Sequence, residues 1–277
     1  MTRMLKDAVT GILSEKEIED LYGAFDQVGD IIILRIPDSL VSKKKTIGKV
    51  LLEKVKTAKS VFYQSSPVSG NFRTRRLELL AGEDKTETEY KENGCRFKVD
   101  VEKAFFSPRL STERERIANL IKDGETVINM FGGVGMFSII AAKKKKCVVY
   151  NIDINPSATK LCEQNIKLNK LVGKVESLTG DAAKIIEERL SGIGDRVLML
   201  LPEKSDEFLD SAIKAAKKNG IIHYYCHIHG DKKNEVSRLA KEHFLEIMKI
   251  KAEILGSKIV RPVGPRFYQA VVDVKLL

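Results

Sequence analysis

The sequence predicts two folded parts, a small α+β domain over residues 1–107 and a larger α/β domain over residues 108–277. Strand signals are closely spaced in the first part, whereas strands and helices alternate strictly in the second. Such alternation is typical of a parallel sheet with helices on both faces. The chain also ends in two strand-like runs, and two closing strands often form an antiparallel pair. We therefore expect a mainly parallel sheet with an antiparallel end.

The small domain is predicted from β-rich runs at residues 30–36, 59–66 and 72–82. A Lys-rich helical segment at 39–58 separates the first two runs. Residues 86–107 are typical of a hairpin that turns at Glu92-Asn93-Gly94, because Asn-Gly readily adopts the positive φ angles of a tight turn. Residues 1–20 lack the continuous apolar core of a signal peptide, so we expect them to begin the folded domain.

The larger domain is predicted to start with a helix over 111–122, capped by Ser111 or Thr112. Pro156 indicates the start of another helix, since proline suits the first helical turn. The alternation then predicts strands at 125–131, 148–154, 175–181, 196–202, 220–226, 247–256 and 268–277. It predicts the intervening helices at 156–171, 182–190, 205–217 and 231–246.

The composition restricts the partners and the compartment. A net charge of +10 favours an acidic partner, first of all nucleic acid, because Lys and Arg neutralise phosphates. A Lys/Glu-rich surface of the thermophilic type would give the same charge, so composition leaves both open. No apolar run reaches the roughly 18 residues of a membrane span. Four widely spaced cysteines are expected to be reduced core residues of a cytoplasmic protein: Cys95, Cys147, Cys162 and Cys226.

Three features at successive strand ends predict a ligand site. The strand ending at Phe131 leads into Gly132-Gly133-Val134-Gly135, where glycines permit a close backbone approach. A dinucleotide site would contain a similar loop. The next strand ends in Asp153, whose carboxylate is suited to ribose hydroxyls. The third ends in Gly180-Asp181-Ala182, which is suited to an adenine edge. Together they predict an adenosyl ligand at the carboxyl edge of the sheet.

These segments resemble the archaeal and eukaryotic tRNA (guanine-37-N1)-methyltransferase family, including the archaeal branch that methylates wyosine intermediates. The resemblance runs from about Asp30 to the C-terminus. It is carried by GCRFKVDVEKAFFSPRLSTERERIA, NMFGGVGMFSI, NIDINPSA, GDAA, DRVLMLLP with EFLD, and GIIHYY. It implies a class I (Rossmann-like) methyltransferase domain with a mainly parallel seven-stranded sheet, preceded by a small RNA-contacting domain.

The resemblance also implies the partners. S-adenosylmethionine would be the methyl donor, and the target would be the purine 3′ of the anticodon, expected in tRNA-Phe. We expect a monomer. The additional N-terminal tRNA-elbow domain that is common in the family is expected to be absent, since strand-rich sequence begins near residue 30.

The resemblance assigns roles to individual residues. Glu113 aligns with the general base, and Arg73 with an arginine that steadies the guanine. An acid in the first helical turn is also favoured by the helix dipole alone, which is the alternative for Glu113. Arg109 and Arg114 are expected to reach RNA or cofactor. The expected cofactor-binding set is Phe106, Arg114, Asn129, Phe131, Gly132, Gly133, Val134, Gly135, Asp153, Ile154, Asn155, Asp181, Ala182, Leu201 and Pro202.

Two departures from the family pattern affect the interpretation. Leu200 stands where N1-methylating members carry an asparagine that meets the target base, and Asn129 stands where an aspartate is usual. Leu200 cannot offer those hydrogen bonds and suits a bulkier, less polar base. We therefore favour methylation of C7 of 4-demethylwyosine, giving isowyosine. N1 methylation of guanosine 37, or both activities, remains the alternative. Asn129 is expected to weaken one cofactor contact.

Other motifs and other classes of function are less favoured by the sequence. His223, Cys226 and His227 resemble metal ligands, but alternate strand residues point to opposite faces, so no metal is expected. Arg261 and Arg266 are expected to flank the target base; the alternative is a tight basic loop. A small-molecule methyltransferase is disfavoured by the basic charge. A non-catalytic RNA-binding protein is disfavoured by the intact glycines and acids.

Overall fold

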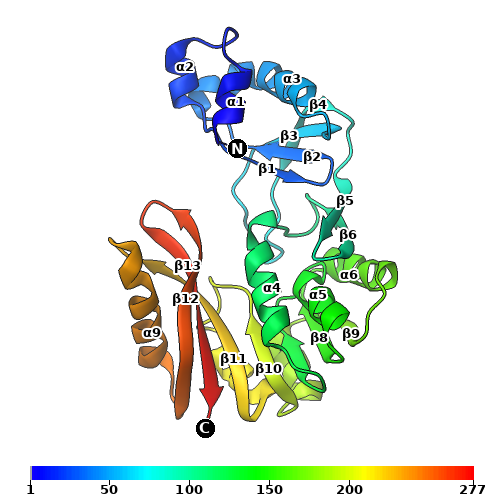
Figure 1. The fold of residues 1–277 in the computed structure, drawn as a ribbon, viewed down its shortest axis with the longest axis vertical. Helices are drawn as coiled ribbons and strands as arrows, with labels where there is room; N and C mark the ends of the chain where they lie inside the picture. The colour runs from blue at the N-terminus through cyan, green and yellow to red at the C-terminus, as the bar shows by residue number, and fades with distance from the viewer. Residues whose placement is uncertain (1) are drawn as a thin grey trace. The chain divides into compact units, whose positions relative to one another are not determined.

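The computed structural model describes residues 2–277. The chain forms two compact units, Met1–Pro108 and Arg109–Leu277, each with its own sheet (Figure 1).

The N-terminal unit contains a four-stranded sheet in the order β1-β2-β3-β4. The central pair β2 and β3 is parallel, and both outer pairs are antiparallel. A separate hairpin is formed by β5 and β6. The strands are β1 (Phe25–Val28), β2 (Ile31–Leu34), β3 (Ser60–Gln64), β4 (Leu77–Gly82), β5 (Glu87–Glu92) and β6 (Cys95–Asp100). The helices are α1 (Thr2–Ala8), α2 (Glu15–Asp20), a 3₁₀ turn (Asp38–Lys43) and α3 (Lys44–Lys54).

Most predictions for this unit are confirmed, with shorter elements. The hairpin turns at Asn93 and Gly94, whose φ angles are 49° and 71°. The predicted helix at 39–58 is divided, because a 3₁₀ turn precedes α3. The first residues do belong to the fold, since Leu5 and Val9 are fully buried in its core. Their arrangement as two helices was not predicted.

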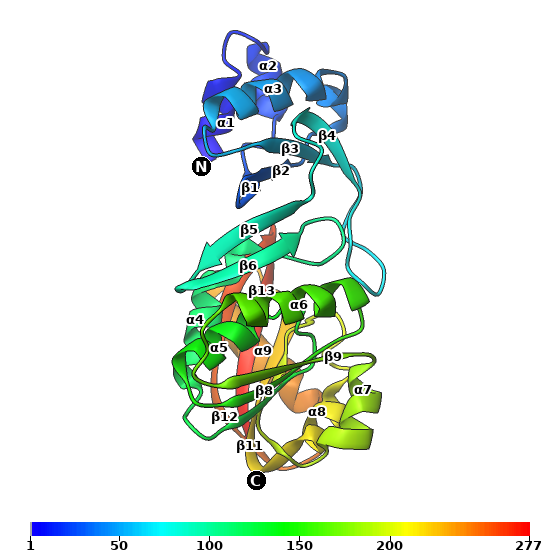
Figure 2. The same ribbon diagram turned by 90° about the vertical axis from the view of Figure 1, so that its right-hand side faces the viewer.

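The C-terminal unit contains the predicted seven-stranded, mainly parallel sheet, in the order β12-β13-β11-β10-β7-β8-β9. Figure 2 shows β8, β9, β11, β12 and β13 of this sheet. Strands β11, β10, β7, β8 and β9 run parallel, and β13 is antiparallel to both of its neighbours. The bounds are β7 (Thr126–Asn129), β8 (Val148–Asp153), β9 (Lys174–Thr179), β10 (Gly194–Met199), β11 (Ala216–His229), β12 (Ala252–Gly264) and β13 (Phe267–Leu276).

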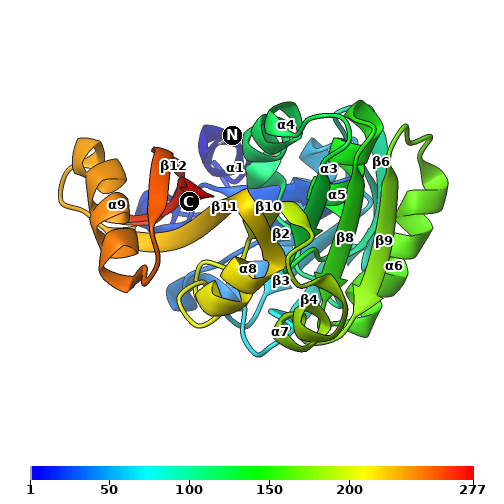
Figure 3. The same ribbon diagram turned by 90° about the horizontal axis from the view of Figure 1, so that it is seen from below.

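Helices cover both faces of this sheet, as Figure 3 shows along the strands. Side chains of α7, α8 and α9 share one apolar core with the sheet, while α4, α5 and α6 pack next to one another on the opposite face. The helices are α4 (Ser111–Leu120), α5 (Met136–Lys144), α6 (Pro156–Leu168), α7 (Ala182–Ile185), continued by a π-helical turn (Ile186–Leu190), α8 (Leu209–Ala215) and α9 (Val236–Ile247).

One local prediction is wrong. Neither Ser111 nor Thr112 caps α4: the cap position is Leu110, with no side-chain bond, because a 3₁₀ turn (Pro108–Leu110) leads directly into the helix. For Arg261, the alternative of a tight basic loop does not hold, because Arg261 lies in β12 and the turn between the last two strands is at Pro265-Arg266.

All four cysteines are buried, as predicted. Burial raises the pKa of the Cys147 thiol to about 11, and the pKa of Cys162 to about 12. Within residues 2–277, no group of His, Cys, Asp and Glu has a metal-binding arrangement. No described helix is both long and apolar enough to cross a membrane.

Candidate active site

The glycine loop after β7 is folded tightly against the end of β8. The Gly132 amide donates to the Ile152 carbonyl at 2.7 Å, and the Gly133 amide donates to Asp153 Oδ2 at 2.7 Å. The loop is further fixed by buried Asn165, which donates to the Val134 carbonyl at 3.0 Å. The loop is thus positioned by hydrogen bonds that its backbone amides and carbonyls make with neighbouring residues.

Two glycines of this loop are required by the protein's own packing. A Cβ at Gly132 would lie 2.1 Å from Asn151 Oδ1, too close for any side chain. Gly135 has a φ of +88°, and a Cβ there would lie 2.5 Å from Cys162 Sγ. Glycine therefore permits a close approach here, but the approach is to β8 and α6 as much as to any ligand.

Asn129, the last residue of β7, is fully buried beside the loop. Its amide donates to Ser138 Oγ at 3.1 Å, and that hydroxyl donates to Asn151 Oδ1 at 2.6 Å. Among the described residues, no group donates to Asn129 Oδ1. A buried acceptor without a donor is costly, so this atom suits a bound group that carries an N–H. A weakened cofactor contact at Asn129 stays a prediction.

Asp153 ends β8 and presents a carboxylate at the carboxyl edge. Its Oδ1 accepts from the Asn155 amide at 2.9 Å and its Oδ2 from Gly133. Burial raises its pKa, and the two backbone bonds offset this only in part. Each carboxylate oxygen retains a second lone pair for a hydroxyl donor. The neighbouring Ile154 side chain is 43% exposed and offers an apolar surface.

The next two strand ends complete this edge. Asp181 follows β9 and caps α7 by accepting from the Lys184 amide at 3.1 Å, with Ala182 buried beside it. Leu200 and Leu201 follow β10 and are partly buried, in a loop held by Ser205, which donates to the Leu201 carbonyl at 3.0 Å. The carboxylates, the glycine loop and the orphaned acceptor fit an adenosyl group that carries an amine.

Glu113 lies on α4, on the other side of the same edge, and its side chain is only 3% exposed. Leu120, the last residue of α4, accepts from Arg196 near the start of β10, so the first turn of the helix lies toward the carboxyl ends of the strands. Tyr225, one residue past the point where β11 pairs with the end of β10, donates to Glu113 Oε1 at 2.6 Å. Lys258 from β12 lies 3.3 Å from Oε2.

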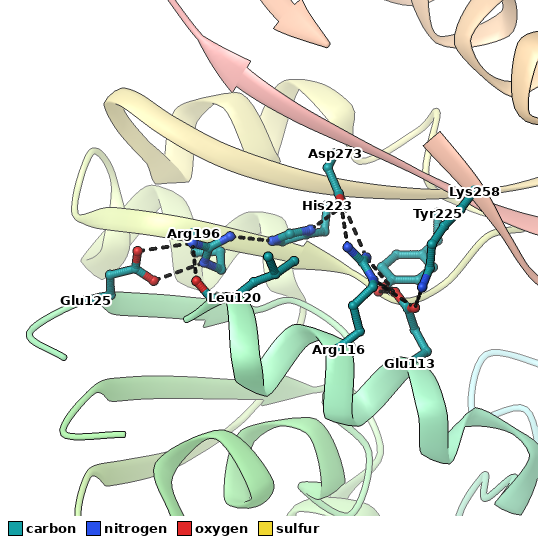
Figure 4. Close-up of polar contacts among 9 residues, drawn as sticks. All are labelled: Glu113, Arg116, Leu120, Glu125, Arg196, His223, Tyr225, Lys258 and Asp273. Atoms are coloured by element: carbon teal, nitrogen blue, oxygen red, sulfur yellow. Dashed lines mark hydrogen bonds and ion pairs between the residues drawn. The ribbon is translucent and has the colours of Figure 1, made fainter. Parts of the chain in front are cut away.

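Behind Glu113, a chain of polar side chains extends into the unit (Figure 4). Arg116 Nη2 donates to Glu113 Oε1 at 2.7 Å, and Arg116 Nη1 donates to Asp273 Oδ2 at 2.5 Å. His223 Nδ1 lies 2.5 Å from Asp273 Oδ1, and its Nε2 lies 2.9 Å from Arg196 Nη1. The chain connects α4 to three strands of the sheet.

At the far end of this chain of polar side chains, Arg196 donates to several acceptors. Arg196 Nε and Nη2 donate to the two carboxylate oxygens of Glu125, at 3.0 and 3.1 Å. Its Nη2 also donates to the Leu120 carbonyl at 3.0 Å, at the end of α4. The helix that carries Glu113 is therefore bonded to this chain at both of its ends.

Burial and charge shift the protonation equilibria in this chain. Burial lowers the pKa of His223, and the nearby arginines lower it further against the opposing effect of Asp273. Burial alone would raise the pKa of Asp273, but the hydrogen bonds from His223 and Arg116, together with the charge of Arg116, outweigh it and lower that pKa. Burial, followed by the charge of Glu113, raises the pKa of Tyr225.

Three of the predicted arginines have defined surroundings. Arg114 is buried with its guanidinium 5.9 Å from the centre of the Phe137 ring. Arg109 is exposed on the 3₁₀ turn before α4. Arg73, in the N-terminal unit, has a φ of 51° and lies 4.2 Å from the centre of the Phe105 ring. Their roles stay predictions.

The remaining predicted residues are also placed. Phe106 is buried in the N-terminal unit. Phe131 packs edge-to-face on Phe208, with ring centres 5.1 Å apart. Arg261 Nε donates to Gln269 Oε1 at 2.8 Å on the neighbouring strand. Arg266 has a φ of 53° and pairs with Asp231 at 3.0 Å.

The polar chain was not found in the sequence. Arg116, Asp273, Arg196 and Lys258 were not singled out there, and His223 was considered only as a metal ligand. Arg116 does follow Glu113 by one helical turn, a spacing that places both on one helix face. Nothing local indicates that Asp273, 157 residues after Arg116, is their partner.

Comparison with known proteins identifies the family. Residues 88–252 match the TRM5/TYW2 methyltransferase domain, and residues 5–86 match the TYW2 N-terminal domain. The chain is 40% identical to tRNA (guanine(37)-N(1))-methyltransferase Trm5b of Pyrococcus abyssi, covering 91% of this chain and 74% of that protein.

Two further relatives belong to the wyosine branch by name. tRNA 4-demethylwyosine(37)-methyltransferase Taw21 of Saccharolobus solfataricus is 36% identical, over 93% of this chain and 95% of its own length. The structure of M. jannaschii TYW2 in complex with AdoMet has a TM-score of 0.66 and 28% identity, and covers 91% of this chain and 98% of its own. The chain thus belongs to the TRM5/TYW2 methyltransferase family, whose members are S-adenosylmethionine-dependent enzymes.

Proposed function

We propose that this chain methylates the purine at position 37 of the tRNA anticodon loop, with Glu113 as general base. The observation that carries the proposal is a buried carboxylate at the same sheet edge as the adenosyl-type site of Asp153 and the glycine loop. Two relatives are named for methyl transfer at tRNA position 37, and the net charge of +10 suits an RNA partner.

The chemistry requires a proton acceptor. S-adenosylmethionine supplies an electrophilic methyl group, and its sulfur keeps the electron pair of the S–CH₃ bond that breaks. The target atom of the purine forms the new bond to the methyl carbon and must lose its hydrogen as a proton. Glu113 would accept that proton, because a carboxylate that is shielded from water and lies beside the purine is an effective general base.

Asp153 and Asp181 would hold the adenosine part, through hydroxyl and amine donors respectively. The glycine loop would provide backbone amides beside it, and Asn129 Oδ1 an acceptor. Arg73 and Arg109 would contact the RNA, since guanidinium groups suit phosphates and stack on bases.

Within this activity we favour C7 of 4-demethylwyosine as the acceptor, giving isowyosine. Leu200, partly buried at the end of β10, offers no hydrogen bond to a guanine edge but offers apolar area to a tricyclic base. The match of residues 5–86 to a TYW2 N-terminal domain supports the same branch.

The second candidate is N1 methylation of guanosine 37. It is favoured by the 40% identity to Trm5b, which exceeds the 36% identity to Taw21. Glu113 as general base and the same cofactor site would serve this reaction, because N1 of guanosine also carries a proton that must leave.

The test compares two tRNA-Phe substrates, one with guanosine and one with the tricycle at position 37. We expect methyl transfer to the tricycle, and product on guanosine alone would contradict the preference. Leu200→Asn is expected to shift the ratio of the two rates toward guanosine, by roughly 10-fold for one buried polar contact. Leu200→Met, which keeps an apolar side chain, serves as the matched control.

A further inference from the structure

We infer that Arg116, Asp273 and His223 are positioning residues for Glu113. They hold its carboxylate in one orientation, in which Oε2 is the oxygen that accepts the proton. The inference rests on the proposed role of Glu113 as base and extends it to residues that do not touch the substrate.

The two oxygens of Glu113 have different surroundings. Oε1 accepts from Arg116 Nη2 at 2.7 Å, from Arg116 Nε at 3.1 Å and from the Tyr225 hydroxyl at 2.6 Å. Oε2 accepts from Arg116 Nε at 2.9 Å and lies 3.3 Å from Lys258 Nζ. The Lys258 side chain is 42% exposed, whereas that of Arg116 is 17% exposed. Oε2 is therefore the oxygen that a substrate can reach, by displacing one long and flexible side chain.

Asp273 determines where Arg116 points. Arg116 donates to both oxygens of Asp273, at 2.5 and 3.2 Å, which fixes the guanidinium plane as a two-pronged pair does. The same guanidinium donates to both oxygens of Glu113, so its fixed plane also determines where the Glu113 carboxylate lies.

The chemistry of Arg196 assigns the tautomer of His223. A guanidinium has only donors, so His223 Nε2, 2.9 Å from Arg196 Nη1, must be the acceptor. The imidazole proton then resides on Nδ1, which donates to Asp273 Oδ1. His223 is therefore neutral, and its Nδ1–H orients Asp273 from the side opposite Arg116. A neutral imidazole also avoids a third positive charge between Arg116 and Arg196.

The charges within this chain of polar side chains are balanced. Three cations face three carboxylates, with the neutral imidazole between them: Lys258, Arg116 and Arg196 against Glu113, Asp273 and Glu125. A buried pair that loses one partner leaves an uncompensated charge. A substitution anywhere along the chain is thus transmitted to the carboxylate that performs the chemistry.

A matched pair of substitutions at His223 tests this inference. In His223→Asn, the amide nitrogen replaces Nδ1 and keeps the bond to Asp273; in His223→Gln, the amide oxygen replaces Nε2 and keeps only Arg196. We expect single-turnover methyl transfer within about 3-fold of the parent for Asn but reduced about 10-fold for Gln, part of the 10²–10⁴-fold worth of a general base. Equal rates for the two variants would overturn the inference.

A second readout separates positioning from simple loss of structure. Asp273→Asn removes the carboxylate that fixes the Arg116 guanidinium, so the single-turnover rate should fall about 10-fold while the affinity for S-adenosylmethionine, measured by calorimetry, stays within about 2-fold. Glu187→Gln is the control: Glu187 pairs with Lys214 at the surface, outside this chain of polar side chains, and its loss should leave rate and affinity unchanged. A parent-like rate in Asp273→Asn, or a parallel loss of affinity, contradicts the inference.

Glu113→Gln separates this inference from the proposed function. If that variant keeps the parent single-turnover rate, the role of Glu113 as base is wrong. If it is inactive while both His223 variants and Asp273→Asn behave like the parent, Glu113 keeps its role as general base. The inference that Arg116, Asp273 and His223 position it is then wrong.

Discussion

The two sides of the active edge are built in different ways. On the cofactor side, the contacts come from short stretches, residues 131–135, 153–155 and 180–182, and they are largely backbone bonds. On the side of Glu113, the contacts are ion pairs and hydrogen bonds between side chains from α4, β10, β11, β12 and β13. The first construction leaves a motif in the sequence, because loop geometry demands particular residues. The second leaves none.

The difference also predicts how substitutions on each side change cofactor affinity and reaction rate. Backbone bonds survive most substitutions, so the cofactor side should change affinity gradually unless a glycine is replaced. Charged side chains in a buried chain depend on one another. The side of Glu113 should therefore lose rate while S-adenosylmethionine affinity stays.

The largest effect is expected for Glu113→Gln. The amide cannot accept the proton, and methyl transfer should fall about 10²–10⁴-fold. The affinity for S-adenosylmethionine, measured by calorimetry, should stay within about 2-fold, since Glu113 is not part of the cofactor side. Glu115→Gln, on the exposed face of the same helix, is the control and should keep the parent rate. A parallel loss of affinity would contradict the division into two sides.

Asp153→Ala should act in the opposite way. It removes the carboxylate expected to hold the ribose and the bonds to the Gly133 and Asn155 amides. The Kd for S-adenosylmethionine should rise roughly 10–100-fold, corresponding to about 1.4–2.8 kcal/mol. The rate at saturating cofactor should recover to within a few-fold of the parent. A large rate loss that saturation does not restore would show that Asp153 also serves the chemistry.

Gly135→Ala tests whether the loop glycines serve internal packing. The variant combines a positive φ with a Cβ 2.5 Å from Cys162 Sγ, and should lower the free energy of unfolding by about 2–4 kcal/mol. Gly192→Ala is a matched control, because Gly192 also has a positive φ, +69°, but nothing lies within 4 Å of its Cβ. It should cost only the backbone strain, about 1–2 kcal/mol. Equal losses in denaturant titrations would exclude the packing clash.

The smallest effect is a pH dependence of stability that originates in His223. Its pKa is lowered in the folded state from an ordinary value of 6.5. Below pH 6.5 the unfolded chain takes up a proton that the folded chain does not, so stability falls as pH falls, by at most about 1.4 kcal/mol per pH unit. His223→Asn should remove this slope between pH 7.5 and 5.5, whereas replacing the exposed His229 should not. An unchanged slope in His223→Asn would exclude the neutral imidazole.

The sequence predicted much of the fold because local signals sufficed. The Asn93-Gly94 turn, the helix start at Pro156 and the alternation of strands and helices in the larger domain all follow from periodicity and turn chemistry. The cap of α4 was wrong, since a 3₁₀ turn before it cannot be read from a Ser-Thr pair. The polar chain escaped prediction because its members are paired by sheet register, and registers between β11, β12 and β13 depend on the whole fold.

The separation of the two sides is tested most directly by a double-mutant cycle on S-adenosylmethionine affinity. The cycle compares the parent, Asp153→Ala, Glu113→Gln and the double variant by calorimetry. Independent sites give effects that add within about 0.5 kcal/mol, and this additivity is the result we expect. A coupling energy above about 1 kcal/mol between the two substitutions would contradict the account.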